Sequence, residues 1–199
     1  GKDGATHQGI FDLSYLSSIP NLTIMAPKNK WELSDMLKFA IAADYPVAIR
    51  YPRGDACDLW REMRAPIVQG RSEVLCEGTD VALFAIGTMV EIAWKVKEQL
   101  AEREITATVV NARFMAPLDE EEILSAAEKY PLIVTMEENV VSGGFGEHIA
   151  ALLKEHEAKV KVLPVAIENR FVEHGDVETL RRVLGIDEKT ITDRICEEL

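Results

Sequence analysis

The chain has 199 residues, of which 47% are hydrophobic, and this is enough to bury a core in one large or two small domains. A net charge of −12 at pH 7, without a cluster of Lys and Arg, excludes nucleic acid as an expected partner. The longest apolar run, residues 81–86, is far shorter than the roughly 20 residues of a membrane helix, so we expect no membrane partner. Three scattered cysteines and no visible targeting segment favour a cytoplasmic location.

The first nine residues, Gly-Lys-Asp-Gly-Ala-Thr-His-Gln-Gly, have the composition of a site loop. Glycines let the backbone approach a ligand closely, and here they enclose an acid, a hydroxyl and an imidazole. The imidazole of His7 is a candidate for proton transfer or for holding an oxyanion. Asp3 could orient that imidazole or a substrate hydroxyl. The structural alternatives are a surface or capping histidine and an Asx turn. Because such a loop normally lies between a strand and a helix, we expect the chain to be the C-terminal part of a larger protein.

Residues 22–54 predict a strand, a helix and a second strand. The strand covers 22–26, the helix begins after the cap Asn29 with Glu32 at the capping-box position, and the next strand covers 47–51. Arg53 follows that strand, where ligands of open α/β sheets gather, and its guanidinium could grip a phosphate or carboxylate. Its structural alternative is a solvated loop arginine. Arg50 could share the task, but alternation along the strand points it elsewhere.

Residues 56–71 lose all periodicity and predict a linker between a first unit, 1–55, and a second, 72–199. In the second unit, four apolar strands alternate with helices and predict a small doubly wound domain, so the whole chain is predicted to be α/β. The expected strands are 80–86, 105–110, 132–136 and 160–165, and the expected helices are 89–103, 120–129, 145–153, 177–184 and one from 187 onward.

Three further segments of the second unit invite a functional interpretation. The glycine turn at 143–146 resembles an anion-binding nest, but close backbone packing is the preferred explanation. Residues 137–139, Glu-Glu-Asn, follow a predicted strand end and could contact a cofactor or partner subunit, or simply be solvated. The Glu-His pair in the turn 171–175 could be catalytic, although a structural cap is preferred. The four histidines and three cysteines show no metal-ligand spacing, so no metal site is predicted.

These segments together resemble the 1-deoxy-D-xylulose-5-phosphate synthases, thiamine-diphosphate enzymes of the transketolase superfamily. The most specific motifs are Asp-Gly-Ala-Thr-His-Gln-Gly at 3–9, followed by Phe-Asp-Leu-Ser-Tyr-Leu at 11–16, and Arg-Tyr-Pro-Arg-Gly at 50–54. Residues 111–114, 137–139 and 170–175 match in the same order. Lys2 and Ala5 depart from the family pattern but remove no reactive group. The resemblance implies the second half of a transketolase-type pyrimidine-binding domain in 1–55 and a complete transketolase C-terminal domain in 72–199.

The family is a transferase that joins pyruvate, after decarboxylation, to D-glyceraldehyde 3-phosphate. The product serves isoprenoid, thiamine and pyridoxal biosynthesis. The resemblance implies a homodimer that uses thiamine diphosphate and Mg²⁺. It makes His7 the acid/base or oxyanion-stabilising group, Asp3 and Tyr51 substrate-binding residues, and Arg53 the holder of the phosphate or carboxylate.

The family motif that holds Mg²⁺ and the diphosphate is absent from these residues, as is the glutamate that activates the cofactor. No cofactor-binding residue is therefore assigned, and we expect the chain alone to bind no cofactor and to be inactive. Two alternatives remain open: the C-terminal subunit of a split transketolase-like enzyme, and a non-catalytic dimerisation module.

Overall fold

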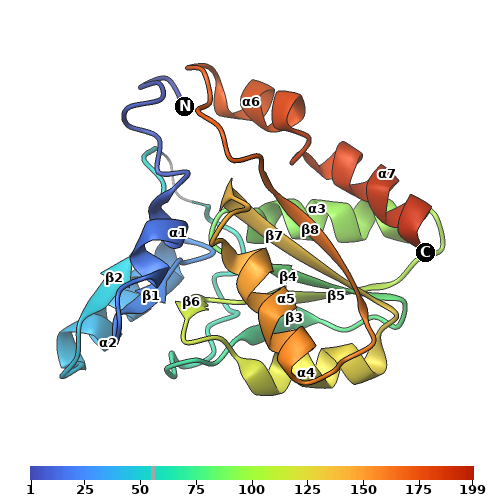
Figure 1. Cartoon of the computed structure of the whole chain (residues 1–199), viewed down its shortest axis with the longest axis horizontal. Coiled ribbons are helices and arrows are strands. Elements are labelled where there is room, and N and C mark those ends of the chain that lie inside the picture. The colour runs from blue at the N-terminus through green and yellow to red at the C-terminus, as the bar shows by residue number, and fades with distance from the viewer. Residues whose placement is uncertain (55–56) are drawn as a thin grey trace.

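The computed structural model describes residues 1–54 and 57–199 and contains two sheets that lie next to each other (Figure 1). The smaller sheet has the order β2 (Val47–Ile49), β1 (Thr23–Met25), β6 (Phe114–Ala116). The larger has the order β3 (Glu73–Cys76), β5 (Ala107–Asn111), β4 (Val81–Ala85), β7 (Leu132–Val140), β8 (Lys161–Ile167). The predicted α/β class is confirmed.

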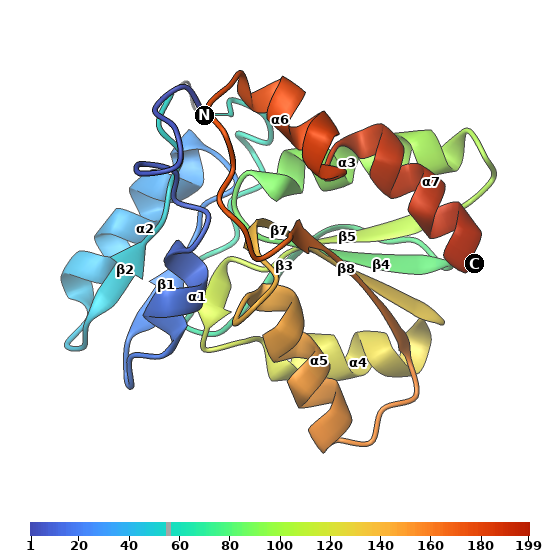
Figure 2. The same cartoon turned by 45° about the horizontal axis from the view of Figure 1, so that its top comes forward.

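The larger sheet is parallel except for β3, which pairs antiparallel with β5 at one edge. Helices α3 (Met89–Ala101), α6 (Val177–Leu184) and α7 (Glu188–Glu198) lie on one side, and α4 (Glu120–Lys129) and α5 (Phe145–Glu155) on the other (Figure 2). This is the predicted doubly wound arrangement. Strand β3 was not predicted from the sequence, because Glu-Val-Leu-Cys has no polar–apolar alternation: Glu73 is buried and Val74 is exposed at this sheet edge.

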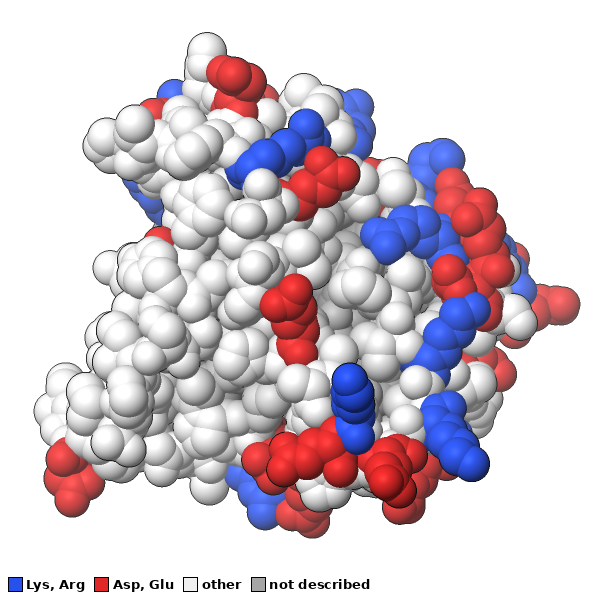
Figure 3. Space-filling view, viewed as in Figure 1, with Lys and Arg blue, Asp and Glu red and all other residues white. Residues whose placement is uncertain are grey.

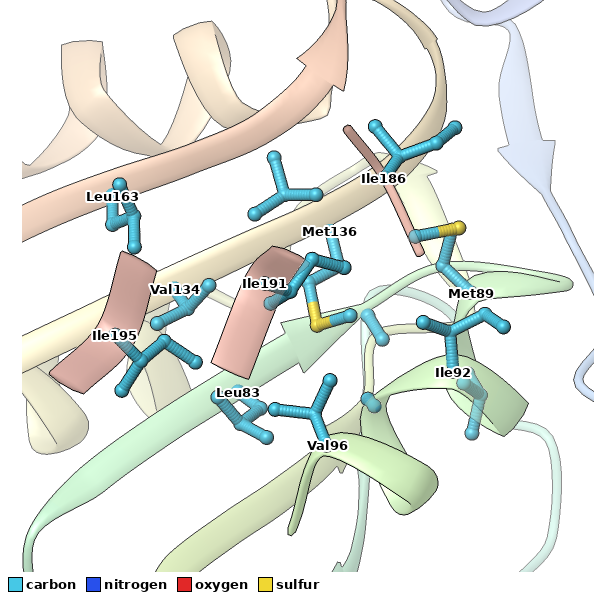
Figure 4. Packing of buried hydrophobic residues seen from close by; sticks show 14 of the residues in the cluster. Leu83, Met89, Ile92, Val96, Val134, Met136, Leu163, Ile186, Ile191 and Ile195 are labelled. Carbon is cyan, nitrogen blue, oxygen red and sulfur yellow. The ribbon is translucent and has the colours of Figure 1, made fainter. Parts of the chain in front are cut away.

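Apolar side chains from α3 and α7 meet over the middle of the larger sheet (Figure 4). Val96 of α3 and Ile191 and Ile195 of α7 pack with Leu83 and Met136 of the sheet, and all five are fully buried. Burial of each such side chain stabilises the fold by roughly 1.5–3 kcal/mol. The C-terminal helix is therefore an integral part of this core.

Helices α1 (Asp12–Ser17) and α2 (Lys30–Ala42) pack against strands of the smaller sheet. The Asn29 side chain accepts a hydrogen bond from the Glu32 amide at 2.8 Å, as the predicted cap requires. The apolar face of α2 is only partly covered: Met36 is buried, but Leu37 and Ile41 are 48% and 84% exposed. The three-stranded sheet, with β2 at its edge, is too narrow to bury the whole face. On the side shown in Figure 3, charged side chains gather over α4 and α7, and the surface over α1 and β2 is almost uncharged.

A strand and a buried ion cluster join the two sheets. Strand β6 leaves the larger unit to pair antiparallel with β1. The ion cluster consists of two cations and two carboxylates. Arg113 donates to Glu32 at 2.7 Å and lies 3.1 Å from Glu73. Lys28 lies 3.4 Å from Glu32 and also pairs with Glu73. All four side chains are at most 8% exposed. The sequence analysis assigned this cluster no role.

The predicted linker contains neither helix nor strand over residues 57–71, and its proposed start at 55–56 lies outside the described residues. It is nevertheless packed against both units. Trp60 contacts Trp94 edge-on with ring centres 5.5 Å apart, and Arg64 forms a two-pronged contact with Asp35 of α2. Among residues 1–54 and 57–199, no helix combines the length and apolar composition that a bilayer crossing requires.

Candidate active site

The glycine-bounded loop 1–9 lies beside a turn from the other end of the chain. The Gly175 amide donates to the Gly1 carbonyl at 3.1 Å, and the Gln8 side chain donates to the Glu173 carbonyl at 3.2 Å. Within the loop, the His7 amide donates to the Gly4 carbonyl at 3.1 Å, and Gly4 adopts a φ of +77° that favours glycine. The sequence analysis did not connect these two segments, because their contact spans the whole fold.

Asp3 and Arg53 form an ion pair at the surface of this loop. Their side chains are 42% and 83% exposed, so the pair contributes less than about 1 kcal/mol to folding. The fold thus brings together two of the residues predicted for substrate binding. A weakly held, solvent-facing guanidinium can exchange its carboxylate partner for a ligand phosphate or carboxylate.

His7 is exposed on the same loop. Its Nδ1 lies 2.9 Å from the Thr6 hydroxyl. When that hydroxyl donates to Nδ1, the ring proton is on Nε2, which has no hydrogen-bond partner within the described part of the chain. Tyr51 is 60% exposed on the segment before Arg53. The structure therefore places one ring nitrogen where it can exchange a proton with a ligand.

Arg50 has a structural use that the sequence analysis did not foresee. Its Nη2 donates to the Gly9 carbonyl at 3.1 Å and to the Glu138 carbonyl at 2.9 Å. The guanidinium thereby ties the end of the site loop to the end of β7. Arg53, the arginine predicted from sequence to bind a ligand, is the more exposed of the two side chains.

Residues 137–139 correct the sequence analysis, which placed them beyond a strand end, in contact with a cofactor or partner or in solvent. They lie within β7, where the pairing with β8 is irregular. Glu137 is 1% exposed and accepts hydrogen bonds from the Phe145 and Gly146 amides at 2.8 and 2.9 Å. The chain's own carboxylate thus fills the apparent anion nest at the start of α5.

The next two side chains of β7 reach different elements. Glu138 accepts from Thr88 at 2.8 Å and pairs with Arg181 of α6 at 3.1 Å. Burial by itself would raise the pKa of Glu138, but the Arg181 guanidinium, together with Arg50 and the Thr88 hydroxyl, holds the pKa below its usual value. Asn139 turns to the opposite side and contacts α1. The apolar pair Val-Val at 140–141, directly after these polar residues, is a sequence signal that the strand continues past Met136.

The turn 171–175 supports the preferred structural interpretation only in part. Val172 is buried, and Phe171 packs edge-on against Phe11 with ring centres 5.5 Å apart. Glu173 and His174 are exposed beside the site loop. No cluster of three or more His, Cys, Asp or Glu side chains suited to a metal ion occurs among residues 1–54 and 57–199.

Two family models match the chain: the transketolase pyrimidine-binding domain over residues 1–57, and the transketolase C-terminal domain over residues 70–191. The chain belongs to the transketolase family. Similar curated transketolase-family proteins include the 1-deoxy-D-xylulose-5-phosphate synthase of Lachnoclostridium phytofermentans, 48% identical over all of this chain and 32% of the relative. A synthase from Geobacter sulfurreducens is 50% identical over 94% of this chain and 30% of its own length. The chain thus spans about a third of the length of the curated relatives it matches.

Solved structures agree with this family membership. A split-gene transketolase, described as an inactive β4 tetramer, superposes with a TM-score of 0.88 at 28% identity, over 98% of this chain and 63% of its own. A transketolase mutant from Pichia stipitis superposes with a TM-score of 0.71 at 20% identity, over 99% of this chain and 28% of its own. The second likeness supports the fold alone.

Proposed function

We propose that this chain supplies the substrate-side loop and the C-terminal domain of a 1-deoxy-D-xylulose-5-phosphate synthase. The enzyme is a transferase that condenses pyruvate, with loss of CO₂, and D-glyceraldehyde 3-phosphate. The observation that carries the proposal is the Asp3–Arg53 pair on the His7 loop, in a chain 48% identical over its full length to such a synthase. We further propose a cytoplasmic homodimer that feeds isoprenoid, thiamine and pyridoxal biosynthesis, with a pyrimidine-domain unit in 1–55, a linker in 56–71 and a C-terminal domain in 72–199.

Each site residue has a role that its chemistry supports. Arg53 grips the acceptor phosphate or the donor carboxylate, which displaces Asp3 from the guanidinium. Asp3 is then free to accept a hydrogen bond from a substrate hydroxyl. His7 passes a proton through Nε2 or donates to a developing oxyanion. Tyr51, exposed before Arg53, lines the same substrate side.

Thiamine diphosphate, when bound, supplies the electron sink for decarboxylation and carbon–carbon bond formation. The residues present fit its reactive side, because His7 is an exposed proton donor on a glycine loop. They do not provide a diphosphate-binding site at the start of α5, because the Phe145 and Gly146 amides already donate hydrogen bonds to Glu137. We therefore assign the diphosphate and Mg²⁺ to other parts of the complete protein.

The test is steady-state turnover of the complete gene product that carries these 199 residues. We expect His7→Ala to lower kcat by about 10²–10⁴-fold, since that is the usual contribution of a positioned acid or base. We expect Asp3→Ala and Arg53→Ala to act mainly on KM, with Arg53→Ala raising KM for the phosphorylated substrate at least tenfold. Matched controls are His156→Ala and Arg61→Ala, both exposed and away from the loop. Near-normal turnover in all three site variants would favour a non-catalytic dimerisation module instead.

A second candidate is the C-terminal subunit of a split transketolase-like enzyme. The superposition on a split-gene transketolase over 98% of this chain favours it. The two candidates differ in whether the reading frame continues upstream of Gly1. A stop codon and a separate start directly before this region would support the split enzyme.

A further inference from the structure

The base of the His7 loop is attached to the end of β7 by a compact set of hydrogen bonds. The Val140 amide donates to the Ile10 carbonyl at 2.7 Å. Asn139 accepts from the Leu13 amide at 3.2 Å through Oδ1 and donates to the Ser14 hydroxyl at 2.8 Å through Nδ2. We propose that Asn139 is a positioning residue that holds the His7 loop in its working geometry. What the loop does rests on the proposed function; how it is held does not.

Asn139 provides the cap that α1 lacks within its own sequence. The Leu13 amide lies in the first turn of α1, where amides have no partner inside the helix. The local N-cap residue, Phe11, makes no side-chain cap hydrogen bond. With only six residues, α1 is far too short to be stable by itself. An amide side chain from another element therefore replaces the usual Ser, Thr or Asp cap.

The orientation of Asn139 is fixed by its surroundings. The residue is 0% exposed, and its Nδ2 also donates to the Val140 carbonyl at 2.7 Å. That second bond keeps Oδ1 turned toward α1. Because Asn139 is fully buried, its removal leaves the Leu13 amide without a partner and away from water, which is more costly than the loss of an exposed hydrogen bond.

The outer contacts of the loop are weaker than its base. The Asp3–Arg53 pair and the Gln8 contact to Glu173 are both solvent-exposed. The base contacts of Asn139 and Val140, together with the Arg50 bridge from Gly9 to Glu138, are therefore the ones that can set the position of His7. A displacement of about 1 Å in a catalytic group can cost about a hundredfold in rate.

The first experiment measures amide hydrogen exchange on this 199-residue chain. In Asn139→Ala, we expect amides of residues 10–16 to exchange at least tenfold faster, while those of β4 and β5 stay within about twofold. The matched control is Tyr130→Phe, directly after α4, which removes the hydrogen bonds of its hydroxyl to Thr108 of β5 and to the Gly78 carbonyl. Unchanged protection at 10–16, or an equal increase everywhere, would overturn the inference. Should Asn139→Ala fail to fold, Ser14→Ala must give a smaller, roughly threefold, increase at the same amides.

The second experiment is a double-mutant cycle in the complete gene product. We expect Asn139→Ala to lower kcat at least tenfold with less than threefold change in KM. In the His7→Ala background, the same substitution should lower kcat by less than threefold, because a residue that acts only through His7 has nothing left to position. If the losses in kcat from the two substitutions are additive, Asn139 does not act through His7, and its positioning role is refuted. If His7→Ala itself keeps full turnover, the proposed function fails, and the exchange result still decides how the loop is held.

Discussion

Glu137 is a carboxylate that the fold withdraws almost completely from water. Burial is the main cause that raises its pKa from 4.5 to about 7, against the opposing effect of the Gly146 and Phe145 amides that donate to it. The positive end of the α5 dipole also favours the ionised form. The pKa of this carboxylate is therefore raised to about 7, although it accepts hydrogen bonds from the first amides of α5.

The first prediction concerns the pH dependence of stability. The Glu137 carboxyl binds its proton more tightly in the folded protein than in the unfolded chain. Its contribution to the free energy of unfolding is therefore fully present below pH 4.5 and is lost as the pH rises through about 7. The rise in pKa is worth on the order of 3 kcal/mol. Glu137→Gln cannot ionise, and its single acceptor oxygen satisfies only one of the two α5 amides, at a cost that does not depend on pH. We therefore expect the stability of the variant relative to the parent chain to rise by this amount between about pH 5 and about pH 8. Urea unfolding at several pH values measures it, and a pH-independent difference would contradict it.

Gly144 and Gly146, at the start of α5, have no room for a Cβ atom. A Cβ on Gly144 would lie 2.5 Å from the Glu137 carboxylate and 2.6 Å from the Val140 carbonyl. A Cβ on Gly146 would lie 2.5 Å from the Thr135 hydroxyl. Close packing was the preferred interpretation of this turn from sequence, and these distances confirm it. The same glycines that let α5 approach β7 also let the first amides of α5 reach the Glu137 carboxylate.

The second prediction follows from that geometry. Gly144→Ala should lower the free energy of unfolding by about 1–3 kcal/mol, the usual effect of forcing extra volume into a packed site. Ser142→Ala, an exposed change in the same turn, should stay within about 0.5 kcal/mol. Chemical denaturation followed by circular dichroism compares the two, and an equal effect of both would show that the turn can widen.

At the scale of the whole molecule, the two sheets are held together by charge as well as by strand pairing. Lys28 and Glu32 come from the smaller unit, Glu73 from β3 and Arg113 from the segment between β5 and β6. Glu32 also accepts from the Asn111 side chain at 2.9 Å. Two cations and two carboxylates balance in a site closed to water. The cluster fixes how the units meet, because the Lys28–Glu73 and Arg113–Glu32 pairs cross the junction and are lost if the units separate.

The third prediction tests this junction. Arg113→Met leaves two buried carboxylates with Lys28 as their only cationic partner in the described structure, and we expect a loss of about 3–5 kcal/mol in unfolding free energy. Arg64→Met removes a two-pronged but solvent-exposed contact with Asp35 and should therefore cost much less than Arg113→Met. Calorimetry or denaturant unfolding distinguishes them. A small effect of Arg113→Met would mean that water enters the junction.

The elements with strong local signals were predicted well from sequence. Asn29 and Asp119 cap α2 and α4 as expected, and Gly185 ends α6 in the left-handed conformation. Strands β4, β5 and β8 were found from their apolar runs. Strand β7 was ended too early at Met136, because Glu-Glu-Asn looks like the start of a loop. The short α1 was missed, because its cap, Asn139, lies 126 residues from Leu13.

The order of α/β elements, the glycine loop and the identity of the polar residues near it were determined by the sequence, because each depends on neighbours within a few positions along the chain. Only the tertiary structure decided which of those polar residues stay at the surface of the loop and which are buried. Asp3 and Arg53 meet at the surface, whereas Arg50, Glu137 and Asn139 turn inward to satisfy buried backbone groups. The physical reason is that the sequence pattern around a polar side chain does not reveal its hydrogen-bond partner, which can be water or a backbone group distant along the chain.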